Sequence, residues 1–169
     1  FVEFAGAVQK HRYIGICFGP AGVGKTMSAQ RFARWDKAEP LLKEWGPRDA
    51  SDAIAYEALA KSRTVFYTPT VGGPVREVRE DLRCLIARAE GCIDLALNPS
   101  MVIPERHSQG RMEMLIVDEA ERLSTQSLEH VRDIFDRTGI GVILIGMPGL
   151  ERKLERYPQL YSRIGFARH

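Results

Sequence analysis

The stretch "CFGPAGVGKTMSAQRFARW", Cys17–Trp35, decides the fold. It contains the spacing G-x-x-x-x-G-K-T, in which the fixed positions are Gly19, Gly24, Lys25 and Thr26. An apolar run comes directly before the first of these glycines and predicts a buried strand, and a helix is expected from Lys25 onward. A loop of this kind turns its backbone N–H groups inward around phosphate oxygens, so the stretch predicts a phosphate-binding loop.

A phosphate-binding loop assigns a task to each of its side chains. Lys25 is expected to reach the β- and γ-phosphates of ATP, and Thr26 to ligate Mg²⁺ through its hydroxyl. The positive end of the following helix faces the same anion. The predicted nucleotide contacts are Gly19, Pro20, Ala21, Gly22, Val23, Gly24, Lys25, Thr26 and Met27.

A second motif, "MEMLIVDEAERL" at 112–123, supplies two acids at the end of an apolar strand. Ligands of doubly wound sheets sit at the carboxyl ends of the strands. Asp118 is therefore expected to hold Mg²⁺, through water, and Glu119 to orient or deprotonate the attacking water. Glu121 is expected in a solvated first helical turn, where acids are favoured by the helix dipole.

Strands and helices alternate along the chain, which predicts an α/β fold with a parallel sheet covered on both faces. Unbroken apolar runs make the strands, and three- and four-residue apolar spacing makes the helices. The segment 36–62 is expected to be an insertion at the surface. Strands are expected at 13–18, 64–68, 112–117, 141–146 and from 164, and helices at 2–12 (packing Val2, Ala5 and Val8), 25–35, 51–60, 75–91 (stopped by Gly91), 124–139 (Ser124 to Gly139) and around the break at Pro158.

Composition narrows the class of protein. The 169 residues carry a net charge of +2, so the overall charge does not by itself indicate nucleic-acid binding. A chain of this length is expected to form one domain over 1–169. Three cysteines fit neither a disulfide framework nor a metal site, which favours reduced thiols in the cytoplasm. Cys17 is expected in a buried strand, and the histidines lack metal-ligand spacing. Apolar runs fall short of a membrane span, so no membrane partner is expected.

A third stretch, "VILIGMPGLERKLERYPQLYSRIGF" at 142–166, completes a family resemblance together with the first two motifs. The chain resembles a P-loop NTPase of the AAA+ class, and more narrowly the bacterial transposition ATPases of the MuB, TnsC and TniB kind. ExeA-type secretion ATPases share this core. The resemblance implies a three-layer αβα core with strand order 5-1-4-3-2 and nucleotide-dependent homo-oligomers. It also implies an arginine finger in trans, which Arg163 matches, with Arg152 and Arg156 as weaker candidates.

Two departures from the family pattern stand out. A polar sensor is usual at the end of the fourth strand, where this chain has Gly146, Met147 and Pro148. The sequence also ends near the start of the expected fifth strand, where a helical lid is expected to follow in this family.

The resemblance implies a regulator of transposition that assembles on duplex DNA and recruits or activates a transposase or targeting protein. The alternatives are a protein-remodelling ATPase of the secretion type and a nucleotide switch that does not hydrolyse. For each cation that could contact DNA, a solvated surface is the stronger explanation, because Arg76, Glu77, Arg79, Glu80 and Asp81 form a balanced charged helix face. Trp35 and Trp45 are expected to pack rather than stack on bases. His11, Arg12 and Tyr13 either lie near adenine or simply enter the first strand. Candidate DNA contacts are Arg76, Arg79, Arg106, His107 and Arg111.

Overall fold

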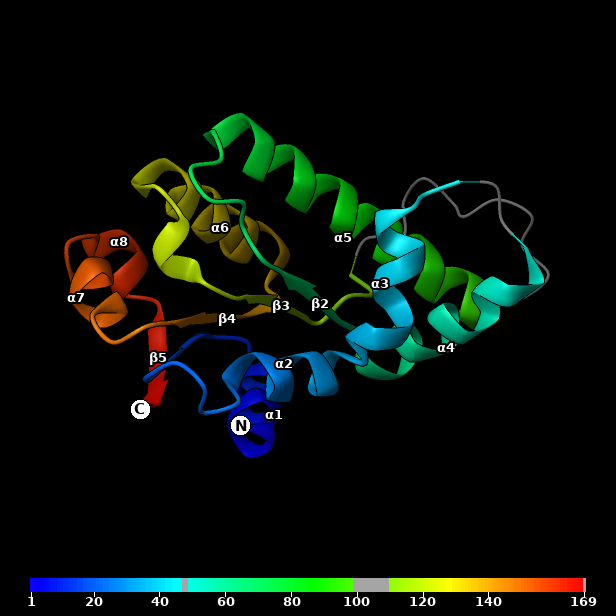
Figure 1. Cartoon of the computed structure of the whole chain (residues 1–169), viewed down its shortest axis with the longest axis horizontal. Coiled ribbons are helices and arrows are strands. Elements are labelled where there is room, and N and C mark those ends of the chain that lie inside the picture. Colours follow the sequence, from blue (N-terminus) through cyan, green and yellow to red (C-terminus); the bar gives the residue numbers. More distant parts are fainter. Residues whose placement is uncertain (47–48, 99–109, 169) are drawn as a thin grey trace.

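Five parallel strands form one sheet in the computed structural model, which describes residues 1–46, 49–98 and 110–168 (Figure 1). Their order is β2-β3-β4-β1-β5, which confirms the expected order 5-1-4-3-2. The carboxyl ends of all five strands therefore meet at one edge of the sheet. The strands are β1 (Ile14–Phe18), β2 (Thr64–Tyr67), β3 (Met114–Val117), β4 (Gly141–Gly146) and β5 (Ile164–Arg168).

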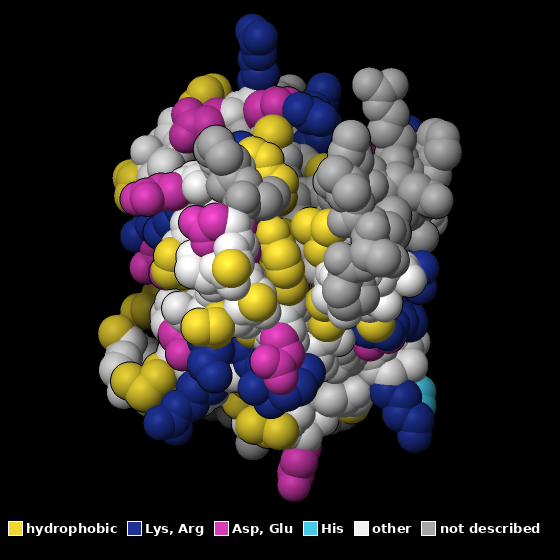
Figure 2. Space-filling view, turned by 90° about the vertical axis from the view of Figure 1, so that its right-hand side faces the viewer, with side chains coloured by type: hydrophobic (Ala, Val, Ile, Leu, Met, Phe, Trp, Pro, Cys, Tyr) yellow, Lys and Arg dark blue, Asp and Glu magenta, His cyan; other side chains and the backbone are white. Residues whose placement is uncertain are grey.

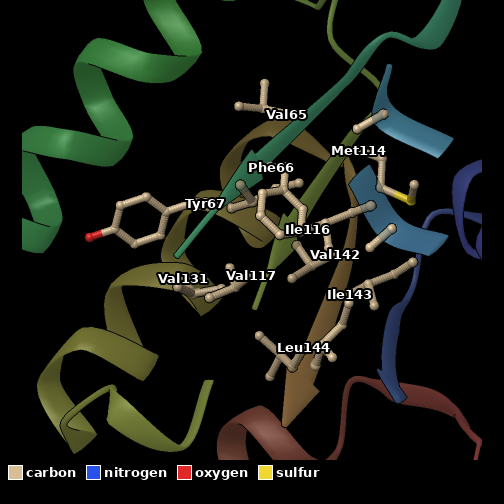
Figure 3. Packing of buried hydrophobic residues seen from close by; sticks show 14 of the residues in the cluster. Val65, Phe66, Tyr67, Met114, Ile116, Val117, Val131, Val142, Ile143 and Leu144 are labelled. Atoms are coloured by element: carbon tan, nitrogen blue, oxygen red, sulfur yellow. The ribbon is translucent and has the colours of Figure 1, made fainter. Parts of the chain in front are cut away.

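Helices cover both faces of the sheet, so the three-layer architecture is also confirmed. Helices α5 and α6 lie on one face, and α1 and α2 lie on the other (Figure 1). Strands β2, β3 and β4 are wholly buried between them, β1 is buried except at Phe18, and Ile116, Ile143 and Leu144 pack in the middle of the core (Figure 3). The helices are α1 (Val2–His11), α2 (Lys25–Ala33), α3 (Trp35–Lys43), α4 (Ala53–Ser62), α5 (Val75–Leu97), α6 (Thr125–Thr138), α7 (Leu150–Glu155) and α8 (Pro158–Tyr161), with 3-10 turns η1 (Ala50–Asp52) and η2 (Ala120–Arg122).

Helix α1 packs Phe4, rather than the predicted Val2, against the sheet. Val2 is 67% exposed, whereas Phe4 and Val8 are buried. Both of these side chains press on β1, where a Cβ atom added to Gly15 would lie 2.7 Å from each of them. The close approach of α1 to the sheet therefore requires a glycine in the strand.

The segment between the phosphate loop and β2 differs from the expected surface insertion. The predicted helix over 25–35 breaks at Arg34, which has a left-handed conformation with φ 53°, and α3 then begins at Trp35. Trp35 and Leu42 are buried, and the Trp35 ring lies 6.0 Å from that of Phe66 on β2. This segment therefore builds part of the core beside the edge strand.

The predicted ends of two helices, α6 and α5, differ in outcome. Helix α6 has the predicted Ser124 cap, whose side chain accepts from the Ser127 N–H, and it ends at Gly139 with φ 64°. The predicted stop at Gly91 is wrong, because α5 continues to Leu97. Gly91 lies inside the helix on a buried face, and burial there outweighs the weak helix propensity of glycine.

Candidate functional site

The phosphate loop joins the carboxyl end of β1 to the start of α2. Gly22 and Gly24 adopt φ values of 82° and 81°, which L-residues with a side chain rarely adopt. Gly24 is the N-cap of α2, and no side chain caps the helix there. The N–H groups of the first turn are therefore left for a ligand, and helix N-termini favour anions.

Lys25 lies folded back over this loop. Its ammonium Nζ donates to the carbonyl oxygens of Gly19, at 2.7 Å, and Pro20, at 2.8 Å. The charge is thus already at the mouth of the loop. To reach a phosphate, Lys25 must exchange these two carbonyls for phosphate oxygens, and its role in phosphate binding stays a prediction.

The first two sequence motifs meet through a hydrogen bond. The Thr26 hydroxyl donates to Oδ2 of Asp118 at 2.6 Å, although the residues are 92 positions apart. Asp118 is 4% exposed, and its Oδ1 accepts the backbone N–H of Glu119 at 3.0 Å. A hydroxyl and a carboxylate held together are the hard oxygen donors that Mg²⁺ prefers, so these residues fit the predicted ion.

The carboxylate of Glu119 is engaged in an interaction that was not predicted from the sequence. Its carboxylate forms an ion pair with Arg122, and Arg122 also donates to the carbonyl oxygen of Pro69 at 3.1 Å, just beyond β2. Glu119 has φ 49°, a left-handed conformation that is uncommon outside glycine. The three-residue spacing from Glu119 to Arg122 was the only signal for this pair in the sequence.

A cavity of ≈ 440 Å³ lies against the phosphate loop, between the end of β1 and Phe1. This volume lies within the range of small-molecule sites. Phe1 contributes to its wall, whereas His11, Arg12 and Tyr13 do not and instead lie at the opposite end of β1. Arg12 pairs there with Glu113, so a strand-entry role explains these three residues. The lining residues are Phe1, Cys17, Phe18, Gly19, Pro20, Val23, Gly24, Lys25 and Ser28.

Glu121 lies in the first turn of η2, as expected, but it is half-buried rather than fully solvated. Its Oε2 is buried and has no hydrogen-bond partner among the described residues. A Cβ atom on Gly146 would lie 2.6 Å from this oxygen, so Glu121 packs against the end of β4. The atypical Met147 beside it is 42% exposed. A carboxylate oxygen and an apolar side chain thus stand where the family usually has a polar sensor.

Arg163, the predicted arginine finger, is engaged within its own chain. Its Nε donates to Oδ1 of Asp136 at 2.6 Å, and its Nη1 donates to the carbonyl oxygen of Gln159. The Arg163 hydrogen bond holds the pKa of Asp136 below its usual value. Action in trans therefore requires Arg163 to leave Asp136 and stays a prediction. Arg152 and Arg156 on and after α7 are exposed.

The candidate DNA contacts fall into three groups. Arg106 and His107 lie outside the described residues. Arg111 pairs at 3.0 Å with Asp94, whose side chain is 5% exposed, so its charge compensates a buried carboxylate. Arg76 and Arg79 are exposed on the first turns of α5. No group of three or more possible metal ligands of the His, Cys, Asp and Glu types occurs in the described ranges.

Comparison with known proteins assigns the class. The chain belongs to the AAA domain family, which matches residues 8–154. It is therefore an ATPase-type, nucleotide-binding protein with the P-loop fold. Within the described residues, no helix is both long and apolar enough to cross a membrane.

Two curated relatives extend this assignment. A "Potential ATP-binding protein" of Staphylococcus aureus is 38% identical to the chain. The alignment covers 99% of this chain and 62% of that protein. The chain is 28% identical, over 96% of its length, to 49% of DNA transposition protein B from a Mu-like prophage of Haemophilus influenzae. The chain thus spans about half to three-fifths of the length of these relatives.

Proposed function

We propose that the protein is a cytoplasmic, Mg²⁺-dependent ATPase that regulates DNA transposition by assembling on duplex DNA. The observation that carries the ATPase part is the 2.6 Å hydrogen bond between Thr26 and Asp118, with Glu119 next in sequence. It brings the two motifs of a phosphoryl-transfer site to one point. The transposition part is supported by the third sequence motif and by the prophage relative.

The proposed reaction is hydrolysis of ATP to ADP and phosphate. Water attacks the γ-phosphorus, and the bond from that phosphorus to the β–γ bridging oxygen breaks. Thr26, and Asp118 through water, would hold Mg²⁺, which would supply positive charge against the phosphates. Lys25 exchanges the carbonyls of Gly19 and Pro20 for β- and γ-phosphate oxygens. Glu119 leaves Arg122 and orients or deprotonates the water.

Completion of the site requires a second copy of the chain in this proposal. Arg163 of one copy leaves Asp136 and stabilises the transition-state charge at the neighbour's γ-phosphate. An arginine delivered in this way accelerates related reactions by about 10³–10⁵. Assembly and catalysis are then linked, and the assembled protein presents itself to a transposase or targeting protein.

The arginine assignment is tested by mixing two inactive variants. Glu119→Gln lacks the base but keeps Arg163, whereas Arg163→Ala lacks the arginine but keeps Glu119. If Arg163 acts in trans, mixed assemblies contain complete sites, and ATP hydrolysis returns on mixing. Arg156→Ala serves as the matched control and keeps its activity. A mixture as inactive as its components overturns the trans assignment.

The proposed function itself is tested by assembly. Light scattering with a random-sequence duplex is expected to report large particles with ATP and Mg²⁺ and none without nucleotide. Lys25→Ala is expected to abolish them, because the loop loses its cation. Lys10→Ala, which removes an exposed lysine from α1, leaves them unchanged. Nucleotide binding without any DNA-dependent assembly contradicts the proposal and favours a protein-remodelling ATPase.

A further inference from the structure

Four cationic side chains from three consecutive helices gather on one face of the molecule. Arg31 lies on α2, Arg34 at the turn into α3, Lys37 on α3 and Lys61 on α4. These four residues, called here the α2–α4 basic patch, are all exposed. Figure 2 shows Lys and Arg side chains gathered around an acidic side chain in the lower part of the face that α3 and α4 form.

The charge of this patch is largely uncompensated. Across the described ranges, Arg31, Arg34 and Lys37 form no ion pair with a carboxylate, and only Lys61 does so, with Glu57 at 2.5 Å. Three cations of α5 and α6 are compensated instead, because Arg83, Arg132 and Arg137 each pair with a carboxylate on their own helix. The patch therefore has free positive charge for a partner.

Three of these cations converge on one small recess. Arg34, Lys37 and Lys61 line a hollow of ≈ 60 Å³ together with Glu57. A water molecule occupies about 30 Å³ in the liquid, so this hollow accepts a few oxygen atoms but not a nucleobase. The hydrogen bond from Lys61, and then the charges of Lys37 and Arg34, lower the pKa of Glu57, so all three cations act at one point.

The patch lies at the far end of the helix that opens the nucleotide site. Helix α2 begins at Lys25 and ends at Ala33, and nine residues at a rise of 1.5 Å span about 13 Å. A ligand at the patch therefore leaves the phosphate loop free. The geometry leaves room for both sites to be occupied at once, and one helix connects them.

We infer that the α2–α4 basic patch binds the phosphate backbone of duplex DNA. The inference rests on the proposed function, which has the protein assemble on DNA, and names the surface that meets the duplex. Contacts between cations and phosphates position a protein without reading sequence, and they release counterions. Binding through this patch is therefore sequence-blind and weakens steeply with salt.

The test compares two double variants that each remove two positive charges. Arg34→Gln with Lys37→Gln empties the centre of the patch, and Arg76→Gln with Arg79→Gln removes the rival cations of α5. Fluorescence anisotropy measures the affinity for a labelled random duplex, with ATP and Mg²⁺, between 50 and 200 mM salt (about the range over which such contacts are resolved).

Each lost phosphate contact lowers the log–log salt slope by roughly 0.9, so the patch variant is expected to lose about 1.8 of the slope. The same relation makes its binding about 60-fold weaker at roughly 0.1 M salt. The Arg76 and Arg79 variant keeps the wild-type slope. ATP affinity and the melting temperature stay unchanged in both variants, because these side chains are exposed and lie outside the phosphate loop.

Each other outcome overturns a specific statement. A patch variant with the wild-type slope shows that DNA binds elsewhere, and the proposed function then stands without this surface. Equal losses in the two double variants indicate an effect of net charge and also overturn the inference. A wild-type protein that binds no duplex in any nucleotide state removes both the inference and the DNA part of the proposed function.

Discussion

Removal of Arg122 is expected to speed ATP hydrolysis, which is an unusual direction for an arginine beside a catalytic site. Arg122 pairs with the carboxylate of Glu119 and ties it to the carbonyl of Pro69. In the proposed mechanism Glu119 must leave this pair before it meets the water. Arg122→Ala therefore removes a ground-state restraint on Glu119.

The size of the effect follows from the exposure of the pair. The side chains of Arg122 and Glu119 are 33% and 41% exposed, and ion pairs at such positions contribute about 0.2–1 kcal/mol. At about 1.4 kcal/mol per factor of ten, basal turnover rises by about 1.4- to 5-fold. Phosphate release measured at saturating ATP, without DNA, reports this change.

Two further variants make this prediction strict. Arg83→Ala breaks a comparable surface pair with Glu80 on α5 and is expected to leave turnover unchanged. In a Glu119→Gln background, Arg122→Ala should have no effect on the rate, because the restrained carboxylate is absent. A fall in turnover in the single Arg122→Ala variant refutes the reasoning and assigns Arg122 a supporting role in the reaction.

Three other predictions concern binding and stability. Lys25→Ala is expected to lose ATP binding in calorimetry, because the loop loses its only lysine, whereas unchanged affinity contradicts the assignment. Burial lowers the pKa of His130 from 6.5, so the unfolded state takes up the proton first and unfolding free energy falls as pH drops below about 6.5. Denaturant titrations of His130→Phe should show a smaller fall in unfolding free energy below about pH 6.5 than those of the wild type. The same pH dependence in both proteins would contradict this role of His130. Gly15→Ala places a methyl group 2.7 Å from Phe4 and Val8 and is expected to cost about 1–3 kcal/mol in denaturant titrations, where a neutral result shows that α1 yields freely.

The sheet could be predicted because its signals are local and strong. Strands β1 to β4 are short runs without a charged residue, and the first two motifs fix which strand ends carry polar residues. The order of the strands followed from the family resemblance. The stop at Gly91 failed for a tertiary reason. Cys92 and Ile93 beyond it are buried, and this packing carries α5 through a residue that ends helices elsewhere in the chain.

The residues of the candidate site could be predicted from the sequence, but several of the contacts that they form in this structure could not. Parallel strand ends meet at one edge, so the meeting of Thr26 with Asp118 follows from the two motifs. The Glu119–Arg122 pair and the buried oxygen of Glu121 depend instead on how η2 sits against its neighbours. Lys153 on α7 holds η2 by donating to the carbonyls of Glu121 and Leu123, a contact that no sequence pattern marks.

The central claim is that this protein hydrolyses ATP with Glu119 as the group that prepares the water, and does so faster on DNA. The most direct measurement is the rate of phosphate release by the wild type and Glu119→Gln, each with and without duplex DNA. The account predicts salt-sensitive stimulation of the wild type by DNA of any sequence. It also predicts a variant that still binds ATP but turns over about 10²–10⁴-fold more slowly. Equal rates for the two proteins would contradict the assignment of Glu119, and wild-type hydrolysis indifferent to DNA would contradict the transposition proposal.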